Sequence, residues 1–367
     1  MREHQVLMAR ALELAERARG RVSPNPLVGA LVVRDGTVMG EGWHEGPGSP
    51  HAEVMALAAA GERARSATLY CTLEPCDHVG RTPACTGAII KAGVSHVVVA
   101  AGDPNPIVDG RGFAQLRTAG IDVTVGPLEM EARRLNEAYE RHVTTGLPFV
   151  TLKMAASLDG RTAARDGSSK WITGEAARAD VQTLRASADA IVVGAGTAIT
   201  DDPSLTIRDP SYSGPPPLRV VVDATGRVPT GLRLFNDEAE TLVVTTDEVE
   251  DERVDAWEAA SADVEIVERD PSGRVSLPDL LSRLGKREVQ SVLVEGGGSL
   301  AWGFVRAGSV DRLVLYMAPK LVGGAHAPGV LMGDGVACIA DALDVDIVSV
   351  ERVGKDLKVV ADVHRDR

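Results

Sequence analysis

Apolar and polar residues follow helical and strand periods in turn along the first half of the chain. Between residues 3 and 19, and again between 51 and 61, apolar side chains recur at helical spacing with charged residues among them. Short β-branched runs between such segments predict strands at 27–33, 38–43, 68–72 and 94–101, with a further helix over 86–92. This alternation is typical of a layered α/β domain.

A second series of strands begins after Pro148. Its predicted members are mostly apolar throughout, which indicates a sheet covered on both faces. One helix is expected over 181–186, among the strands. We therefore expect two three-layer α/β domains, residues 1–146 and 147–367. The strands predicted for the second domain are 149–154, 190–194, 218–223, 242–246, 264–268, 291–295 and 313–318.

Composition supports a folded, non-membrane chain. Of 367 residues, 44% are apolar and 25% are charged, which excludes disorder and a coiled coil. No apolar run approaches 18 residues, and the charged start of the chain lacks the apolar core of a signal peptide, so we expect a cytoplasmic location. Four cysteines are too few for a disulfide scaffold; Cys71 and Cys338 are expected to be core thiols.

The net charge of −13 disfavours a general nucleic-acid binder only if it is evenly spread. It is not, because the stretch 237–270 holds 14 acidic residues and two arginines. Such a run is typical of a solvated face. Charge therefore indicates solubility and does not define the field at a binding site elsewhere.

One group of residues in the first domain has the composition of a catalytic zinc site. His51 and Glu53 stand at the start of a predicted helix, Cys76 follows a strand, and Cys85 comes nine residues later. Catalytic zinc takes three protein ligands and keeps one position for water. A nearby Glu that is not a ligand can move a proton from water to a leaving amine, as in zinc deaminases. The eight residues between the cysteines depart from the usual spacing of two.

The long loop between the cysteines is part of a wider resemblance. Four segments, Ser23–Gly29, His51–Val54, Glu74–Cys85 and Asp103–Pro106, resemble the deaminase half of the RibD/RibG family of bifunctional riboflavin-biosynthesis enzymes. Two departures are visible: Met55 and Ala84 stand where that family often has His and Pro. Neither touches an expected zinc ligand.

The resemblance implies a cytidine-deaminase-like fold and a phosphoribosylated diaminopyrimidine substrate. His51, Cys76 and Cys85 would hold Zn²⁺, and Glu53 would be catalytic. The loop supplies phosphate-binding side chains. The expected deaminase substrate contacts are Asn25, His44, His78, Arg81 and Thr82.

The second domain carries its own set of motifs. The segments 153–162, 168–173, 194–197, 201–206 and 294–300 resemble the reductase half of the same family, which has a dihydrofolate-reductase-like fold. The resemblance implies NADPH and reduction of the ribosylamino group at C1 of the sugar. A Gly-rich strand-to-helix turn suits a pyrophosphate. The implied substrate residues are Ser169, Arg185, Leu205, Arg208 and Glu295, with the two arginines as a phosphate clamp. The implied cofactor residues are Ala155, Trp171, Thr197, Asp201, Gly297, Gly298, Ser299 and Leu300.

The sequence thus predicts an enzyme of two successive steps, hydrolytic deamination followed by reduction. Its partners are expected to be phosphorylated small-molecule pyrimidines, with no nucleic acid or membrane, in a homo-oligomer (dimer or tetramer). Three alternatives remain open: a deaminase of another base, a nucleic-acid-editing protein with the zinc fold, and a structural-zinc module fused to an interaction domain.

Overall fold

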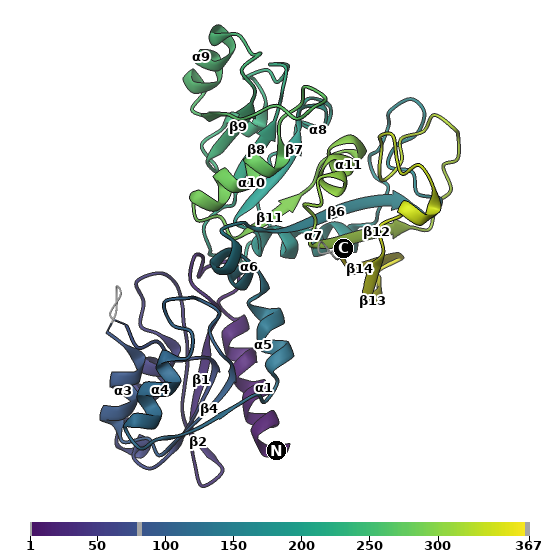
Figure 1. Ribbon diagram of the computed structural model, residues 1–367. Helices are drawn as coiled ribbons and strands as arrows, with labels where there is room; N and C mark the ends of the chain where they lie inside the picture. Colours follow the sequence, from purple (N-terminus) through teal and green to yellow (C-terminus); the bar gives the residue numbers. More distant parts are fainter. Residues whose placement is uncertain (1, 79–82, 364–367) are drawn as a thin grey trace. The chain divides into compact units, whose positions relative to one another are not determined.

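The structure is a computed structural model that describes residues 2–78 and 83–363. Contacts divide the chain into two compact units, Met1–Gly146 and Leu147–Arg367 (Figure 1). Within the described residues, every helix is too short or too polar to cross a membrane.

The first unit is a five-stranded sheet in the order β2-β1-β3-β4-β5, with helices on both faces. Strands β1 and β2 form the antiparallel hairpin, and β3, β4 and β5 are parallel. The elements are α1 (Arg2–Glu16), β1 (Gly29–Arg34), β2 (Thr37–Trp43), α2 (Ala52–Ala60), the 3-10 turn η1 (Gly61–Ala64), β3 (Thr68–Leu73), α3 (Cys85–Ala92), β4 (His96–Ala101), α4 (Arg111–Thr118), β5 (Asp122–Val125), α5 (Glu129–Leu135) and α6 (Glu137–Thr145).

Alternation along the strands sorts the core of this unit into two layers. Ala30 and Val32 pack toward α2, α3 and α4, whereas Leu31 and Val33 pack toward α1 and α5. Helix α2 approaches β2 very closely. A Cβ added at Gly42 would lie 2.4 Å from the Ala52 carbonyl oxygen, so this strand needs a glycine there. The close approach fixes where α2 begins.

The second unit is a nine-stranded sheet in the order β10-β9-β8-β7-β11-β6-β12-β14-β13. All its strands from β10 to β12 are parallel, and β14 and β13 are antiparallel at one edge. The elements are β6 (Phe149–Ser157), α7 (Glu175–Ala186), β7 (Ala190–Gly194), α8 (Ala195–Asp201), β8 (Leu218–Val222), η2 (Arg233–Phe235), β9 (Thr241–Thr245), α9 (Asp251–Ala259), β10 (Asp263–Ile266), α10 (Leu277–Lys286), β11 (Ser291–Val294), α11 (Gly298–Arg306), β12 (Arg312–Ala318), η3 (Ile339–Asp341), β13 (Val345–Val353) and β14 (Asp356–Val363).

Helices cover both faces of the parallel part of this sheet. Helices α10 and α11 cover one face through Leu280, Leu284 and Phe304. Helices α7, α8 and α9 cover the other, where Trp257 is fully buried. The expectation of three-layer α/β domains is confirmed.

Several local expectations are wrong. Helix α1 ends at Glu16, short of the predicted limit at residue 19, and α7 begins six residues earlier than expected, at Glu175. Cys71 is buried as expected, but Cys338 is exposed and belongs to no core. Strands β13 and β14 were not expected.

Candidate active sites

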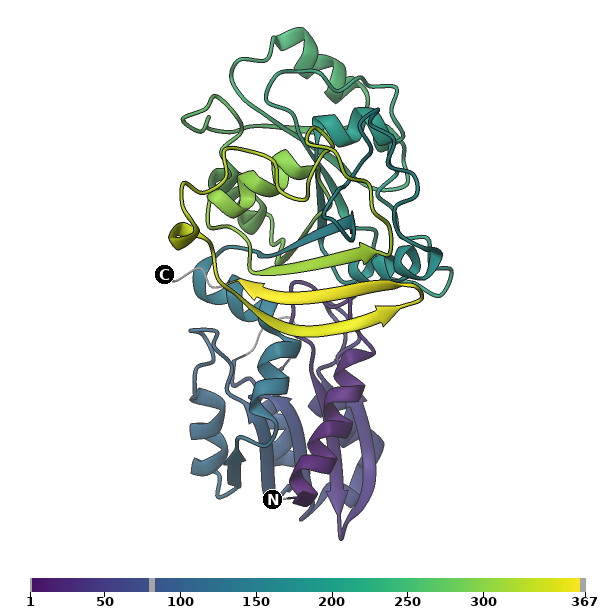
Figure 2. The same ribbon diagram turned by 90° about the vertical axis from the view of Figure 1, so that its right-hand side faces the viewer.

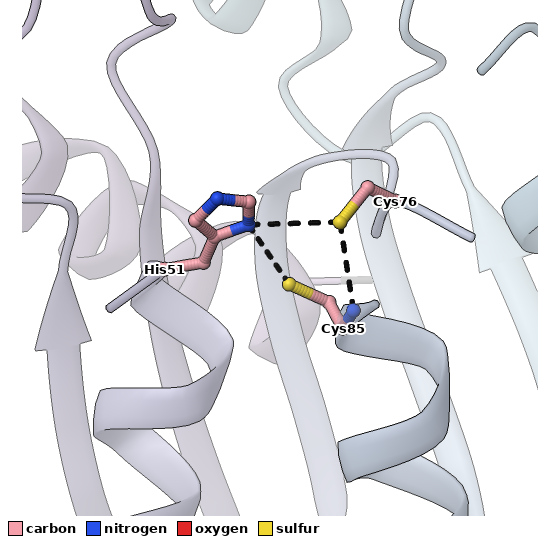
Figure 3. Close-up of side chains that lie close together, drawn as sticks. All are labelled: His51, Cys76 and Cys85. Carbon is pink, nitrogen blue, oxygen red and sulfur yellow. Dashed lines mark hydrogen bonds between the residues drawn. The ribbon is translucent and has the colours of Figure 1, made fainter. Parts of the chain in front are cut away.

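Three side chains of the first unit form a compact group of metal-ligand type. His51 is the N-cap of α2, Cys76 lies in the loop after β3, and Cys85 begins α3. Their ligand atoms all lie within 4.8 Å of one another. The Nδ1 atom of His51 is 3.0 Å from Cys85 Sγ and 3.6 Å from Cys76 Sγ (Figure 3). One imidazole and two thiols at this separation fit zinc with an open position.

Hydrogen bonds within the group favour the ionised form of one thiol. The hydrogen bond from the Cys85 thiol, with a further contribution from His51, lowers the pKa of Cys76 to about 4. The same bond raises the pKa of Cys85, so these two thiols share one proton. A thiolate beside an imidazole is the form that binds a metal.

Glu53 lies beside this group on the first turn of α2. Its side chain is 3% exposed, and burial raises the pKa of its carboxyl. It is hydrogen-bonded to Cys85 and is not needed to complete the set of three ligands. A buried carboxyl with a raised pKa next to a metal site is suited to accept a proton and pass it on.

Glu74 and a backbone hydrogen bond hold neighbouring segments against the strand end that carries Cys76. Its carboxylate accepts backbone N–H groups of Gly110 at 3.1 Å and Phe113 at 3.2 Å. The N–H of Thr86 donates to the Cys76 carbonyl at 3.1 Å, which holds the start of α3 against the first cysteine loop. Glu74 had no predicted role, although it stands two residues before Cys76 in the recognised motif.

Two of the predicted deaminase contacts lie against the metal-type group. The His44 ring is perpendicular to the His51 ring with centroids 5.5 Å apart, and His44 Nε2 is 2.9 Å from Asn25 Nδ2. Burial lowers the pKa of His44, so the neutral ring accepts the amide hydrogen of Asn25. Of the other three, His78 is exposed, and Arg81 and Thr82 lie outside the described residues.

The second unit contains a large cavity at the carboxyl ends of its parallel strands. Its volume is about 1400 Å³. In parallel α/β sheets, ligands bind at this edge. The structure brings most of the predicted reductase residues together on its walls: Ala155, Ser169, Trp171, Thr197, Asp201, Glu295, Gly297, Gly298, Ser299 and Leu300.

The remaining predicted reductase residues do not line this cavity. Leu205 is buried, and Arg208 is exposed and donates its backbone N–H to Gln182. Arg185 is 8% exposed, and its guanidinium donates two hydrogen bonds to the Glu295 carboxylate, at 2.6 and 3.1 Å. Its third bond goes to the Thr206 carbonyl. The guanidinium is therefore committed to protein partners in this structure.

Lys153 joins the same buried network. Its Nζ is 3.5 Å from Glu295 Oε2, and its side chain lines the cavity. Burial alone would raise the pKa of Glu295, but the charges of Lys153 and Arg185 lower it to about 2. Lys153 lay inside a recognised motif without an assigned role, since its partner is 142 residues away in the sequence.

Trp171 and Asp201 stand at the open part of the cavity. Trp171 is 61% exposed, with the Arg178 guanidinium 4.6 Å from the ring centroid. It is therefore not a core indole. The Asp201 carboxylate is 4.0 Å from Lys170 Nζ.

Comparisons with known proteins agree for both units. The family model "Cytidine and deoxycytidylate deaminase zinc-binding region" matches residues 1–101, and "RibD C-terminal domain" matches residues 148–359. The riboflavin biosynthesis protein RibD of Escherichia coli is 43% identical over 97% of this chain and 98% of its own; that of Aquifex aeolicus is 43% identical over 96% of each.

Solved structures give the same result. Acinetobacter baumannii RibD (form 1) superposes with a TM-score of 0.89 at 39% identity, covering 99% of each chain. The Thermotoga maritima diaminohydroxyphosphoribosylaminopyrimidine deaminase/5-amino-6-(5-phosphoribosylamino)uracil reductase superposes with a TM-score of 0.86 at 36% identity, also over 99% of each.

Proposed function

Because this chain belongs to the RibD family of riboflavin biosynthesis proteins, we propose how its own residues carry out two successive reactions. The chain is a bifunctional enzyme of riboflavin biosynthesis with a zinc-binding deaminase domain and an NADPH-dependent reductase domain. The first reaction is hydrolytic deamination of 2,5-diamino-6-(5-phosphoribosylamino)pyrimidin-4-one. The second reduces the ribose of 5-amino-6-(5-phosphoribosylamino)uracil. We assign deamination to residues 1–146 and reduction to residues 147–367.

The deaminase assignment rests on one observation, the grouping of three ligand atoms beside a buried carboxyl. His51, Cys76 and Cys85 would hold zinc, which when bound would supply a Lewis acid that makes water nucleophilic near neutral pH. Glu53 would accept the proton of the attacking water and deliver it to the departing amine, a role that suits a carboxyl with a raised pKa. Asn25, held by His44, hydrogen-bonds the pyrimidine edge. His78, Arg81 and Thr82 bind the substrate phosphate.

The substitution Glu53→Gln tests this division of labour. It removes the proton carrier and keeps the size of the side chain, so deamination should fall by at least about 100-fold. Reduction of supplied 5-amino-6-(5-phosphoribosylamino)uracil should stay near the wild-type rate. Loss of both activities in a variant with wild-type circular dichroism would refute the two-site assignment.

The reductase assignment rests on the Lys153–Glu295–Arg185 network, in which Lys153 and Glu295 line the cavity and Arg185 lies behind Glu295. NADPH, when bound, supplies a hydride to C1 of the sugar. The first amides of α11 and the turn at Gly297 line the cavity and fit its pyrophosphate, because the N–H groups at a helix start are free to bind an anion. Thr197, Ala155, Trp171 and Asp201 complete the cofactor side with Gly298, Ser299 and Leu300.

On the substrate side, Glu295 stays ionised. Its carboxylate contacts both the Lys153 ammonium and the Arg185 guanidinium. Lys153 thereby presents Nζ to the cavity, and Ser169 lies on the same wall. Leu205 and Arg208 belong to the segment that the Arg185 bond to Thr206 anchors, and Arg208 keeps an exposed guanidinium for the substrate phosphate. Alanine at Ser169 should raise KM for the uracil substrate while KM for NADPH is retained.

We further propose a homo-oligomer, a dimer or tetramer, that forms through the edge strand β13. Figure 2 shows β13 and β14 as the two yellow strands at the edge of the sheet. Ile347 and Val350 of β13 are 65% and 58% exposed, on a strand that pairs only with β14 among the residues that the structure describes. An exposed apolar edge strand favours pairing with another chain.

The proposed cellular location and partners follow from the chemistry of the two sites. Zinc-binding thiols must stay reduced, which favours the cytoplasm. The partners are phosphorylated pyrimidines, with no nucleic acid. RibD relatives match this chain over both units. This disfavours a deaminase of another base, a nucleic-acid-editing protein and a structural-zinc module, because none of these three alternatives needs a reductase domain.

A further inference from the structure

Two arginines that line the cavity in the second unit have no ionic partner among the described residues. Arg227 and Arg274 both line this cavity, and among residues 2–78 and 83–363 neither guanidinium has an ion pair or a hydrogen bond. Two other arginines that line the cavity are already neutralised by carboxylates. Arg269 pairs with Asp247 and Glu248, and Arg306 pairs with Asp270 at 3.2 Å. Of these four arginines, therefore, only Arg227 and Arg274 carry a positive charge that no carboxylate pairs among the described residues.

The order of strands shows which part of a dinucleotide would reach Arg227. Arg227 follows β8, which is separated from β6 by β7 and β11. At about 4.8 Å between neighbouring strands, β8 lies roughly 14 Å from β6 across the sheet. The proposed pyrophosphate turn at Gly297 follows β11, between the two. A cofactor with its nicotinamide near Lys153 and its pyrophosphate at Gly297 therefore extends its adenosine toward β8.

The two arginines are carried by turns of the same design. The Asp223 carboxylate accepts the backbone N–H of Val228 at 2.7 Å, and Gly226, at φ +72°, immediately precedes Arg227.

In the second turn, the Asp270 carboxylate accepts the backbone N–H of Ser272 at 2.8 Å and of Arg274 at 3.0 Å. Gly273, at φ +77°, immediately precedes Arg274. In both turns an Asp and a left-handed Gly fix the backbone, while the arginine side chain stays exposed to the cavity. A binding group on a fixed backbone loses little entropy when its ligand arrives.

We propose that Arg227 and Arg274 bind the 2′-phosphate of NADPH and set the preference for NADPH over NADH. This inference rests on the proposed function, since it takes the cavity to be the dinucleotide site. A phosphate monoester carries close to two negative charges and accepts paired hydrogen bonds from guanidinium groups. NADH has a neutral hydroxyl at that position and gains nothing from the two charges.

Calorimetric titration of the full chain with NADP⁺ and NAD⁺ tests the assignment independently of turnover. Arg227→Gln and Arg274→Gln should each raise the dissociation constant for NADP⁺ about tenfold, and the double variant about 100-fold. The dissociation constant for NAD⁺ should stay within about twofold. The same variants should lose the preference of the wild type for 2′,5′-ADP over 5′-AMP. Arg287→Gln removes an equal charge from the same unit, away from the cavity, and should change neither cofactor.

Two results would overturn the proposal on an otherwise functional site. One is a double variant that still prefers NADP⁺ as strongly as the wild type. The other is a double variant that loses NADP⁺ and NAD⁺ to the same degree, because a general defect of the cavity does not read the 2′ position. Failure of the wild-type chain to bind either dinucleotide would overturn the reductase assignment as well.

Discussion

The substitution Glu295→Gln offers a sharp test of the charge network in the second unit, because this carboxylate is buried between two cations. Its side chain is 8% exposed, and it contacts Arg185 at 2.6 Å and Lys153 at 3.5 Å. Its folded pKa of about 2 lies below the ordinary value of 4.5. A group with a lowered folded pKa stabilises the fold above its unfolded pKa, and this contribution is lost as the pH falls through the folded value.

The size of the effect follows from the shift. A difference of about 2.5 pH units corresponds to about 3 kcal/mol of unfolding free energy at pH 7. By the same linkage, about 2 kcal/mol of this disappears between pH 7 and pH 3, and the rest is lost below pH 3. In Glu295→Gln the two cations face a neutral amide, so the variant should be less stable by about 3 kcal/mol at pH 7 and by clearly less at pH 3.

Urea unfolding followed by tryptophan fluorescence measures this difference. A Trp43→Phe background leaves three tryptophans, all in the second unit, so the signal reports that unit. Subtracting the variant from its parent at each pH removes the general effect of acid on the other carboxylates. As a control, Asp263→Asn removes a carboxylate that is 69% exposed, and should cost less than about 1 kcal/mol with little pH dependence. A constant difference between Glu295→Gln and its parent from pH 7 to pH 3 would refute the reasoning.

Three further outcomes are expected. Prolonged chelation should abolish ammonia release while leaving NADPH oxidation with the supplied uracil substrate, and added Zn²⁺ should restore the first signal; a chelator-resistant deaminase would contradict the ligand assignment. Ile347→Lys should shift the species seen by light scattering toward the monomer, whereas Lys at the exposed Met130 should not; an unchanged mass would exclude β13 as the interface. Gly42→Ala should destabilise the first unit by roughly 1–3 kcal/mol and reduce deamination, because its methyl group would collide with Ala52 at the start of α2; thermal unfolding and ammonia release check it.

Features that are local in the sequence could be predicted from it, and long-range pairings could not. The spacing from His51 to Glu53 and the strand before Cys76 indicated a metal site because a helix start and a strand end are local features. Arg185 and Glu295 are 110 residues apart, so their pairing depends on β11 lying next to β6 and β7, which no local pattern specifies. Strand β13 was missed because most of its residues, apolar and charged alike, are exposed, so it shows neither strict alternation nor a continuous apolar run.

The structure shows which arginines pair with the carboxylates of the acidic stretch 237–270. Its carboxylates pair with arginines around the second unit: Asp247 and Glu248 with Arg269, and Asp263 and Glu265 with Arg287. Neither guanidinium of the proposed 2′-phosphate site, Arg227 or Arg274, is among them. Because ionic screening confines an exposed charge to about 8 Å at physiological salt, the remote carboxylates of a chain of net charge −13 do not cancel two unpaired arginines on a cavity wall. Binding of an anionic cofactor therefore depends on which arginines the acidic residues leave unpaired, and the overall charge of the chain does not predict it.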